Sequence, residues 1–129
     1  MNYLTEIRDT LVSNSKLSEW FATDPKMIFV GNIPPKYIER KDVTTVLITG
    51  LSNTFTAYGG NTANAREQEV EIKIWYAPNV AFERFEWALN EALEHIGFRA
   101  FSFDGPKVDE ENKQNKSILQ IRRTKFKGE

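Results

Sequence analysis

Hydrophobic and polar residues alternate most regularly between residues 66 and 79, in the stretch REQEVEIKIWYAPN. Val70, Ile72 and Ile74 occupy every second position, and mostly charged residues lie between them. A period of two predicts a β-strand, roughly over 67–77, with one face toward the core and one toward solvent. Trp75 falls on the charged face, where a large aromatic side chain is either ordinary surface or an anchor for another subunit.

Two segments show the three-to-four-residue spacing of an amphipathic helix. The first covers residues 2–12, with Asn2 as a suitable N-terminal cap. The second covers residues 80–96, and Gly97 follows it at the position where glycine commonly ends a helix. The apolar stripes that should face the core are Leu4, Ile7 and Leu11 in the first helix and Phe82, Phe85, Leu89, Ala92, Leu93 and Ile96 in the second.

Shorter apolar runs predict the remaining strands, and Leu17, Trp20 and Phe21 indicate one further helical turn. Residues 51–66, LSNTFTAYGGNTANAR, have no apolar period, and we expect a long flexible loop there. Residues 104–116 are polar and read as a second, hairpin-like loop. The additional strands are expected at Met27–Val30, 42–50, 98–103 and 117–126.

This order of elements predicts a single α+β domain over residues 1–129. Its sheet should be mixed or antiparallel with about four to five strands, and the N-terminal helix and the long amphipathic helix should pack on one side of it. A chain of 129 residues is long enough to bury its own core without crosslinks.

Composition narrows the possible chemistry. The chain has no cysteine, which excludes disulfides and thiol catalysis. Its formal net charge of −1 argues against a polyanion binder that works by bulk electrostatics. The N-terminal segment carries Glu6 and Asp9 and lacks a long apolar run, so it predicts neither a signal peptide nor a membrane span.

Residues that commonly perform catalysis or bind metals are sparse and scattered. His95 is the single histidine and falls in the last turn of the second helix, where a cation favours the helix dipole. The acidic run 109–111 lacks the spacing of a calcium loop and reads as solvated charge. Gly59-Gly60-Asn61 lacks the lysine of a phosphate-binding loop and indicates flexibility instead. We therefore expect no enzyme, no metal and no cofactor.

Charge is unevenly distributed along the chain. Residues 83–111 contain eight acidic and three basic side chains, whereas residues 113–127 contain six basic and no acidic ones. Three interpretations follow: the basic end faces nucleic acid, the two blocks pair head to tail between identical subunits, or neighbouring elements neutralise each other within one fold. Sequence alone leaves all three open.

Six stretches together carry a resemblance that covers nearly the whole chain. Their combination resembles the tail-terminator and tail-completion (minor tail component) proteins of long-tailed, siphovirus-type bacteriophages or prophages. The stretches are the opening helix YLTEIRDTLV, the turn GNIPPKY, the loop YGGNTANARE, the strand EVEIKIWY, the helix FERFEWALNEALEHIGF and the closing basic strand SILQIRRTKF.

This resemblance implies a structural protein without enzymatic activity or cofactor. Such proteins form a ring, often a hexamer, on the head-proximal end of the tail tube, stop tube growth and join the tail to the head. The implied partners are further copies of the chain, the major tail tube protein and a head-completion or connector protein. Genome DNA passes through the lumen without specific binding, no membrane is involved, and the protein resides in the host cytoplasm during assembly and then in the virion.

Two sets of residues are the candidate contact surfaces under this hypothesis. Another head–tail connector or neck completion protein, and a small nucleic-acid-binding module that uses the basic C-terminal strand, are the alternatives. The candidate oligomer or tube interface comprises Tyr58, Gly59, Gly60, Asn61, Asn64, Arg66 and Trp75, and the candidate lumen or inter-subunit basic patch comprises Arg122, Arg123 and Lys125.

Overall fold

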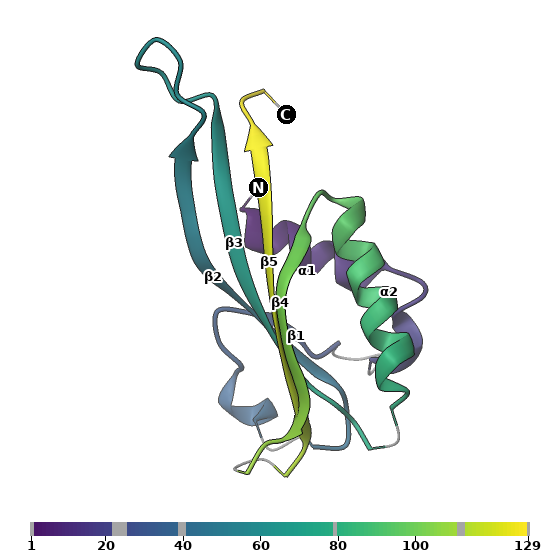
Figure 1. The fold of residues 1–129 in the computed structure, drawn as a ribbon. Helices are drawn as coiled ribbons and strands as arrows, with labels where there is room; N and C mark the ends of the chain where they lie inside the picture. Colours follow the sequence, from purple (N-terminus) through teal and green to yellow (C-terminus); the bar gives the residue numbers. More distant parts are fainter. Residues whose placement is uncertain (1, 22–25, 39–40, 79, 111–112, 129) are drawn as a thin grey trace.

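A computed structural model describes residues 2–21, 26–38, 41–78, 80–110 and 113–128 (Figure 1). The described residues form two α-helices and a five-stranded mixed sheet, which confirms the predicted α+β class. The helices are α1 (Tyr3–Ser13) and α2 (Phe82–His95), with short 3₁₀ helices η1 (Ser18–Trp20) and η2 (Pro35–Tyr37). The strands are β1 (Ile28–Val30), β2 (Thr45–Thr56), β3 (Ala65–Trp75), β4 (Arg99–Val108) and β5 (Asn115–Phe126).

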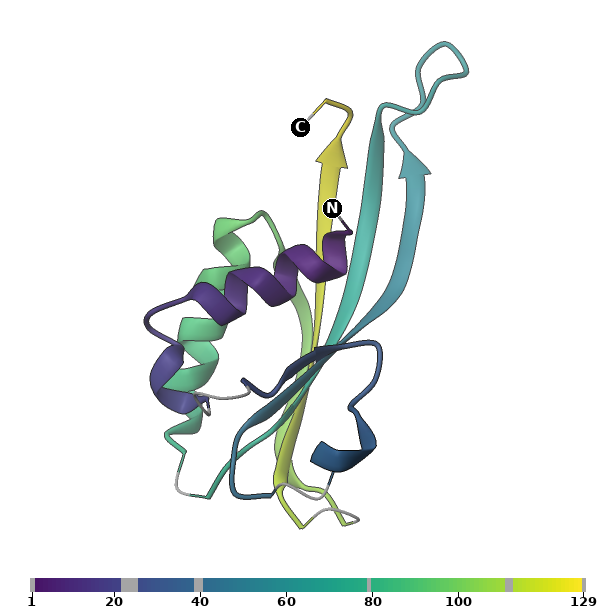
Figure 2. The ribbon, with the colours of Figure 1, turned by 180° about the vertical axis from the view of Figure 1, so that it is seen from behind.

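The strands lie in the order β1-β2-β3-β5-β4. The short β1 runs parallel to β2, and all the other neighbours are antiparallel. Strand β5 follows β4 in the chain but lies between β3 and β4. Both α-helices pack on one face of the sheet, as the pattern of apolar residues predicts (Figures 1 and 2).

The core lies between this face and the two helices. Val70, Ile72 and Ile74 of β3 are completely buried, which confirms the predicted orientation of the strand. From α2, Phe85 and Leu89 pack into the same cluster. Burying aliphatic and aromatic side chains of this size stabilises the fold by roughly 1.5–3 kcal/mol each.

Both helices begin or end where the sequence predicts. The backbone N–H of Leu4 donates to Asn2 Oδ1 at 2.7 Å, so Asn2 is the N-terminal cap of α1. At the end of α2, Gly97 adopts φ +91°, a left-handed conformation that favours glycine. The N–H groups of Gly97 and Phe98 donate to the carbonyls of Glu94 and Leu93, both at 3.0 Å, and so satisfy the last turn.

The prediction of a long loop at 51–66 is wrong. Strand β2 continues to Thr56 and β3 starts at Ala65, so residues 57–64 alone connect them. The two strands stay paired along this length, with one β-bulge after Gly50. The second predicted loop is also shorter, since β4 extends to Val108 and β5 begins at Asn115.

The far half of this hairpin projects beyond the helices, and we call residues 51–66 the hairpin extension (Figures 1 and 2). At its tip, Gly59 and Thr62 exchange two backbone hydrogen bonds of 3.0 and 3.1 Å. The two residues between them, Gly60 and Asn61, have φ of +58° and +67°. Two consecutive positive φ angles define a type I′ turn, so the Gly-Gly-Asn stretch forms a specific tight turn.

Candidate functional site

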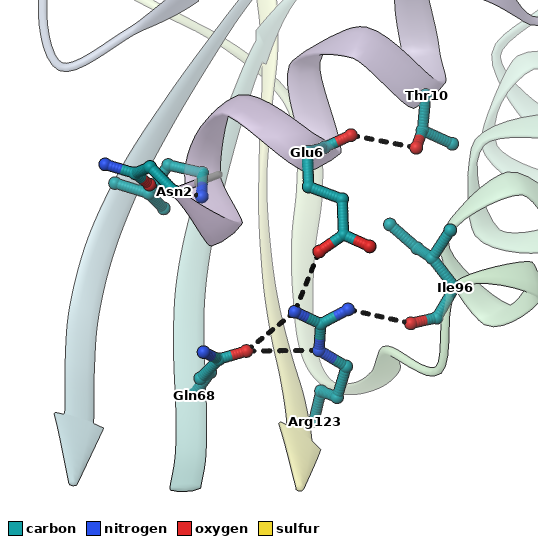
Figure 3. Close-up of polar contacts among 7 residues, drawn as sticks. Asn2, Glu6, Thr10, Gln68, Ile96 and Arg123 are labelled. Atoms are coloured by element: carbon teal, nitrogen blue, oxygen red, sulfur yellow. Dashed lines mark hydrogen bonds and ion pairs between the residues drawn. The ribbon is translucent and has the colours of Figure 1, made fainter. Parts of the chain in front are cut away.

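Arg123 joins four elements of the fold (Figure 3). Its guanidinium donates to Gln68 Oε1 of β3 from Nε at 3.1 Å and from Nη2 at 2.7 Å. Nη1 donates to the Ile96 carbonyl after α2 at 3.0 Å, and Nη2 also reaches Glu6 Oε1 of α1 at 2.9 Å. The ring of Phe98 lies 4.3 Å from the guanidinium carbon.

This environment gives Arg123 a structural role. Its side chain is 7% exposed, which contradicts its prediction as part of an accessible basic patch. Its hydrogen bond to Glu6 is the main reason that the pKa of that carboxyl is lowered, although partial burial acts in the opposite direction. A buried charge needs such partners because desolvation would otherwise make it costly.

The other two residues of the predicted basic patch lie in different surroundings. Arg122 points to the opposite face of the sheet, where its guanidinium lies 3.7 Å from Glu67 and 3.5 Å from Glu69 of β3. It also stacks over Phe101 at 4.4 Å. Lys125 has no ion-pair partner among the described residues. The structure therefore separates the three side chains and leaves Lys125 alone available to a partner.

Trp75 is shielded from solvent, and its prediction as an exposed subunit anchor is wrong. It is 9% exposed, and its Nε1 donates to Asp109 Oδ2 at 3.0 Å. The ammonium of Lys116 lies 5.1 Å from the ring centroid. The loop after β4 thus caps the charged face at this end of β3. Asp109 is accordingly more than solvated charge, and Glu111 of the same acidic run lies outside the described residues.

The remaining residues of the predicted interface lie together on the hairpin extension. Tyr58 is 67% exposed beside the tip turn. Asn64 has a structural role, since its Nδ2 donates to the Ala57 carbonyl at 2.8 Å. Arg66 places its guanidinium 4.6 Å from the ring centroid of Phe55. The structure brings these residues and Gly59, Gly60 and Asn61 to one end of β3 and leaves Trp75 at the other.

A groove of about 1070 Å³ lies between the hairpin extension and the N-terminus of α1. We call it the hairpin groove, and two aromatic residues in its lining, Phe55 and Phe126, are 58% and 53% exposed. Neither residue was part of the interface predicted from the sequence, although an isolated aromatic residue within a polar stretch was an available signal. The lining residues that matter below are Tyr3, Phe55, Arg66, Lys125, Phe126 and Lys127.

Elsewhere, the titratable side chains with shifted pKa values form a packed polar network. The Tyr76 hydroxyl donates to Glu86 Oε2 at 2.7 Å and lies 3.0 Å from Ser117 Oγ. Burial raises the pKa of Tyr76 and is also the main cause of the raised pKa of Glu86. Tyr76 therefore stays neutral and links β3 to α2 and β5.

The described residues contain no group of three or more His, Cys, Asp or Glu side chains that could hold a metal ion. His95 lies in the last turn of α2, at the position predicted for it. Within the described ranges, no helix has the length and apolar character needed to cross a membrane.

Comparison with known proteins places the chain in a family. Residues 5–125, from α1 to β5, match the model of DUF806, a family described as proteins of unknown function. Because the match covers most of the 129 residues, the chain belongs to the DUF806 family. No curated protein matches the chain.

Proposed function

We propose that the protein is a non-enzymatic tail assembly protein of a long-tailed bacteriophage or prophage. In this role it is a tail terminator that forms a ring on the tail tube and joins the tail to the head. The hairpin extension is the observation that carries the proposal. It reaches beyond the helices, so it adds little to the core, yet it exposes Phe55 and Tyr58. A projecting arm with exposed aromatic residues is suited to contact another protein.

The backbone of the extension supports the same role. Strand β1 pairs only with residues 46–48 of β2. Beyond Ile48, the outer edge of β2 has no neighbouring strand among the described residues. An open edge accepts a strand from a neighbouring subunit or from the tail tube through main-chain hydrogen bonds. A ring forms when such a contact joins two different surfaces and rotation closes the series.

The alternatives are supported less well. A nucleic-acid-binding module would rely on the basic β5, but Arg122 and Arg123 are engaged by acidic or polar side chains of the same chain. A neck or head-completion protein would use the same projecting arm, so the binding partner distinguishes it. Tail terminators bind isolated tail tubes, whereas head-completion proteins bind filled or empty heads.

The test measures assembly directly. Size-exclusion chromatography with light scattering gives the mass over a range of concentrations, and negative-stain microscopy examines mixtures with isolated tail tubes and with heads. We expect closed rings, either free or at one end of the tubes. A protein that remains monomeric at every concentration and ignores tubes would contradict the proposal. Binding to heads alone would favour the connector role.

A matched pair of variants tests the hairpin extension itself. Phe55→Ser with Tyr58→Ser removes both exposed aromatic groups and should abolish ring or tube binding. Folding stability should change by no more than about 0.5 kcal/mol, because surface positions contribute little to the core. The control is Ile38→Ser, which alters a residue that is 51% exposed but lies outside the extension, and it should assemble normally.

A further inference from the structure

The outward face of α2 carries a large exposed aromatic side chain among acidic residues. Trp87 is 63% exposed. Glu83 and Glu91 lie one helical turn before and after it, and Glu94 extends the same stripe. All three glutamates are exposed, and the stripe lies opposite the buried face of the helix. We call Glu83, Trp87, Glu91 and Glu94 the acidic ridge.

Little within the same chain neutralises the ridge. Glu91 has one solvent-exposed ion pair, to Lys16 at 3.6 Å, and such pairs are weak. The neighbouring Arg84 is directed to Glu19 at 3.5 Å and lies over Trp20 at 5.5 Å. The ridge therefore presents net negative charge around an unburied indole.

The hairpin groove has the opposite character. Arg66 of β3 and Lys125 of β5 lie directly opposite each other in the sheet, so their side chains project from the same face. Neither has an ion-pair partner among the described residues. Glu6, the acidic side chain in the lining, is held by Arg123. Like charges facing each other across strands are destabilising, and an anionic partner would relieve this repulsion.

The two surfaces cannot meet within one molecule. Figures 1 and 2 both place α2 to one side of the sheet, well away from the hairpin extension. A contact between them therefore joins the acidic ridge of one copy to the hairpin groove of another. The first copy still has a free groove, and the second still has a free ridge. Such a heterologous contact continues from subunit to subunit until it closes.

We infer that the acidic ridge of one copy docks in the hairpin groove of the next copy. Trp87 packs against Phe55, and Glu83 and Glu94 lie against Arg66 and Lys125, which project from the same face of the sheet as Phe55. Burial of a tryptophan in such a contact covers on the order of 150–250 Å². Charge complementarity then orients each subunit relative to its neighbour. This inference rests on the proposed function and specifies which surfaces join the subunits.

A charge-reversal pair tests the contact. One variant reverses the ridge (Glu83→Lys, Glu94→Lys) and the other reverses the groove (Lys125→Glu, Lys127→Glu). Each alone brings like charges together and should fail to assemble. An equimolar mixture restores opposite charges at every contact, so alternating assemblies should form again. The control double variant, Lys36→Glu with Lys113→Glu, reverses exposed charges outside both surfaces and should assemble as the original protein does.

Trp87→Ala supplies an independent measurement. Because Trp87 is largely exposed, the melting temperature should stay close to that of the original chain. The dissociation constant for assembly should rise by about 30-fold or more, as for an interface residue that contributes at least about 2 kcal/mol. The blue shift of tryptophan fluorescence on assembly should also be reduced in this variant.

The outcomes separate this inference from the proposed function. If the original chain assembles but the mixture of folded, charge-reversed variants does not, the ridge–groove contact is wrong and the assembly role stands. If the original chain assembles neither alone nor on tail tubes, the proposed assembly role and the ridge–groove contact are both wrong. If groove reversal abolishes binding to duplex DNA and leaves assembly unchanged, the groove binds nucleic acid and the inference is overturned.

Discussion

Arg123 shows how one side chain can organise several elements. Its four hydrogen bonds reach α1, β3 and the end of α2 from a position on β5. Removing it would leave Gln68, the Ile96 carbonyl and Glu6 without a shared donor. The neighbouring Arg122 points to the opposite face and contributes only exposed ion pairs, so adjacent arginines differ greatly in their importance for stability.

Glu6→Gln should lower the free energy of unfolding by about 1–3 kcal/mol at pH 7, since the buried guanidinium loses its charged partner. Because folding lowers the pKa of Glu6, its stabilising effect is present above the ordinary value of 4.5 and is lost as the pH falls through the folded-state pKa. Denaturant unfolding of the variant and of the original chain, at pH 7 and at pH 3, measures the difference in their free energies of unfolding at each pH.

The difference between Glu6→Gln and the original chain should therefore shrink at pH 3. Asp9→Asn is the control, because Asp9 lies on the same helix but pairs with Arg8 at the exposed surface. Its effect should stay within about 0.5 kcal/mol. An equal loss of stability for both variants would show that Arg123 does not depend on Glu6.

At the level of elements, apolar periodicity predicted those parts of strands that have a helix packed on them. Val70, Ile72 and Ile74 alternate because α2 and α1 cover one face of β3. Residues 51–56 have no such cover, so they carry no period although residues 52–56 pair with β3. The alternation also placed Trp75 on the correct face but could not reveal that the loop carrying Asp109 covers that face.

In the candidate site, too, sequence predicted what depends on neighbouring residues and missed what depends on residues distant in the chain. Sequence identified the tip residues of the hairpin extension, and the structure groups them. It could not separate Arg122 from Arg123, because the partners of Arg123 come from Glu6 and Gln68, distant in the chain. The hairpin groove was missed for a related reason, since its lining residues come from α1, β2, β3 and β5, which are distant from one another in the chain.

Gly60→Val should weaken the hairpin extension and leave the core intact. A β-branched residue at positive φ costs about 1–3 kcal/mol, and the extension has no helix to compensate for this strain. Amide hydrogen exchange should therefore accelerate in residues 52–56 and 65–69, with protection of 70–74 unchanged. Asn61→Gly is the control, since glycine accepts positive φ at no steric cost. Equal loss of protection across all of β3 would contradict an independently opening extension.

For the whole molecule, a formal net charge of −1 conceals a strong separation of charge. The acidic ridge lies on α2, and Arg66 and Lys125, which have no ion-pair partner within the described ranges, lie on the strands that border the hairpin groove. The predicted acidic and basic blocks therefore do contribute to two separate charged surfaces. Arg122 and Arg123 of the basic block form their ion pairs with β3 and α1 instead, through Glu67, Glu69 and Glu6.

Assembly should accordingly weaken with salt. Raising NaCl from about 0.1 M to 1 M shortens the screening length from about 10 Å to 3 Å, which suppresses attraction between exposed charges. Light scattering should show loss of assemblies, whereas the melting temperature of the subunit should change little because the Arg123 network is buried. Assemblies that become more stable in high salt would indicate that apolar contacts, and not complementary charges, hold the subunits together.

The position of β5 links synthesis to assembly. This strand is made after the other four, yet it lies inside the sheet, between β3 and β4. It also supplies Lys125 and Phe126 to the hairpin groove. Leu119 and Ile121 of the same strand are part of the core against which α2 packs. One strand therefore completes both the fold and the groove, so a subunit can receive a neighbour only after β5 has been made and inserted.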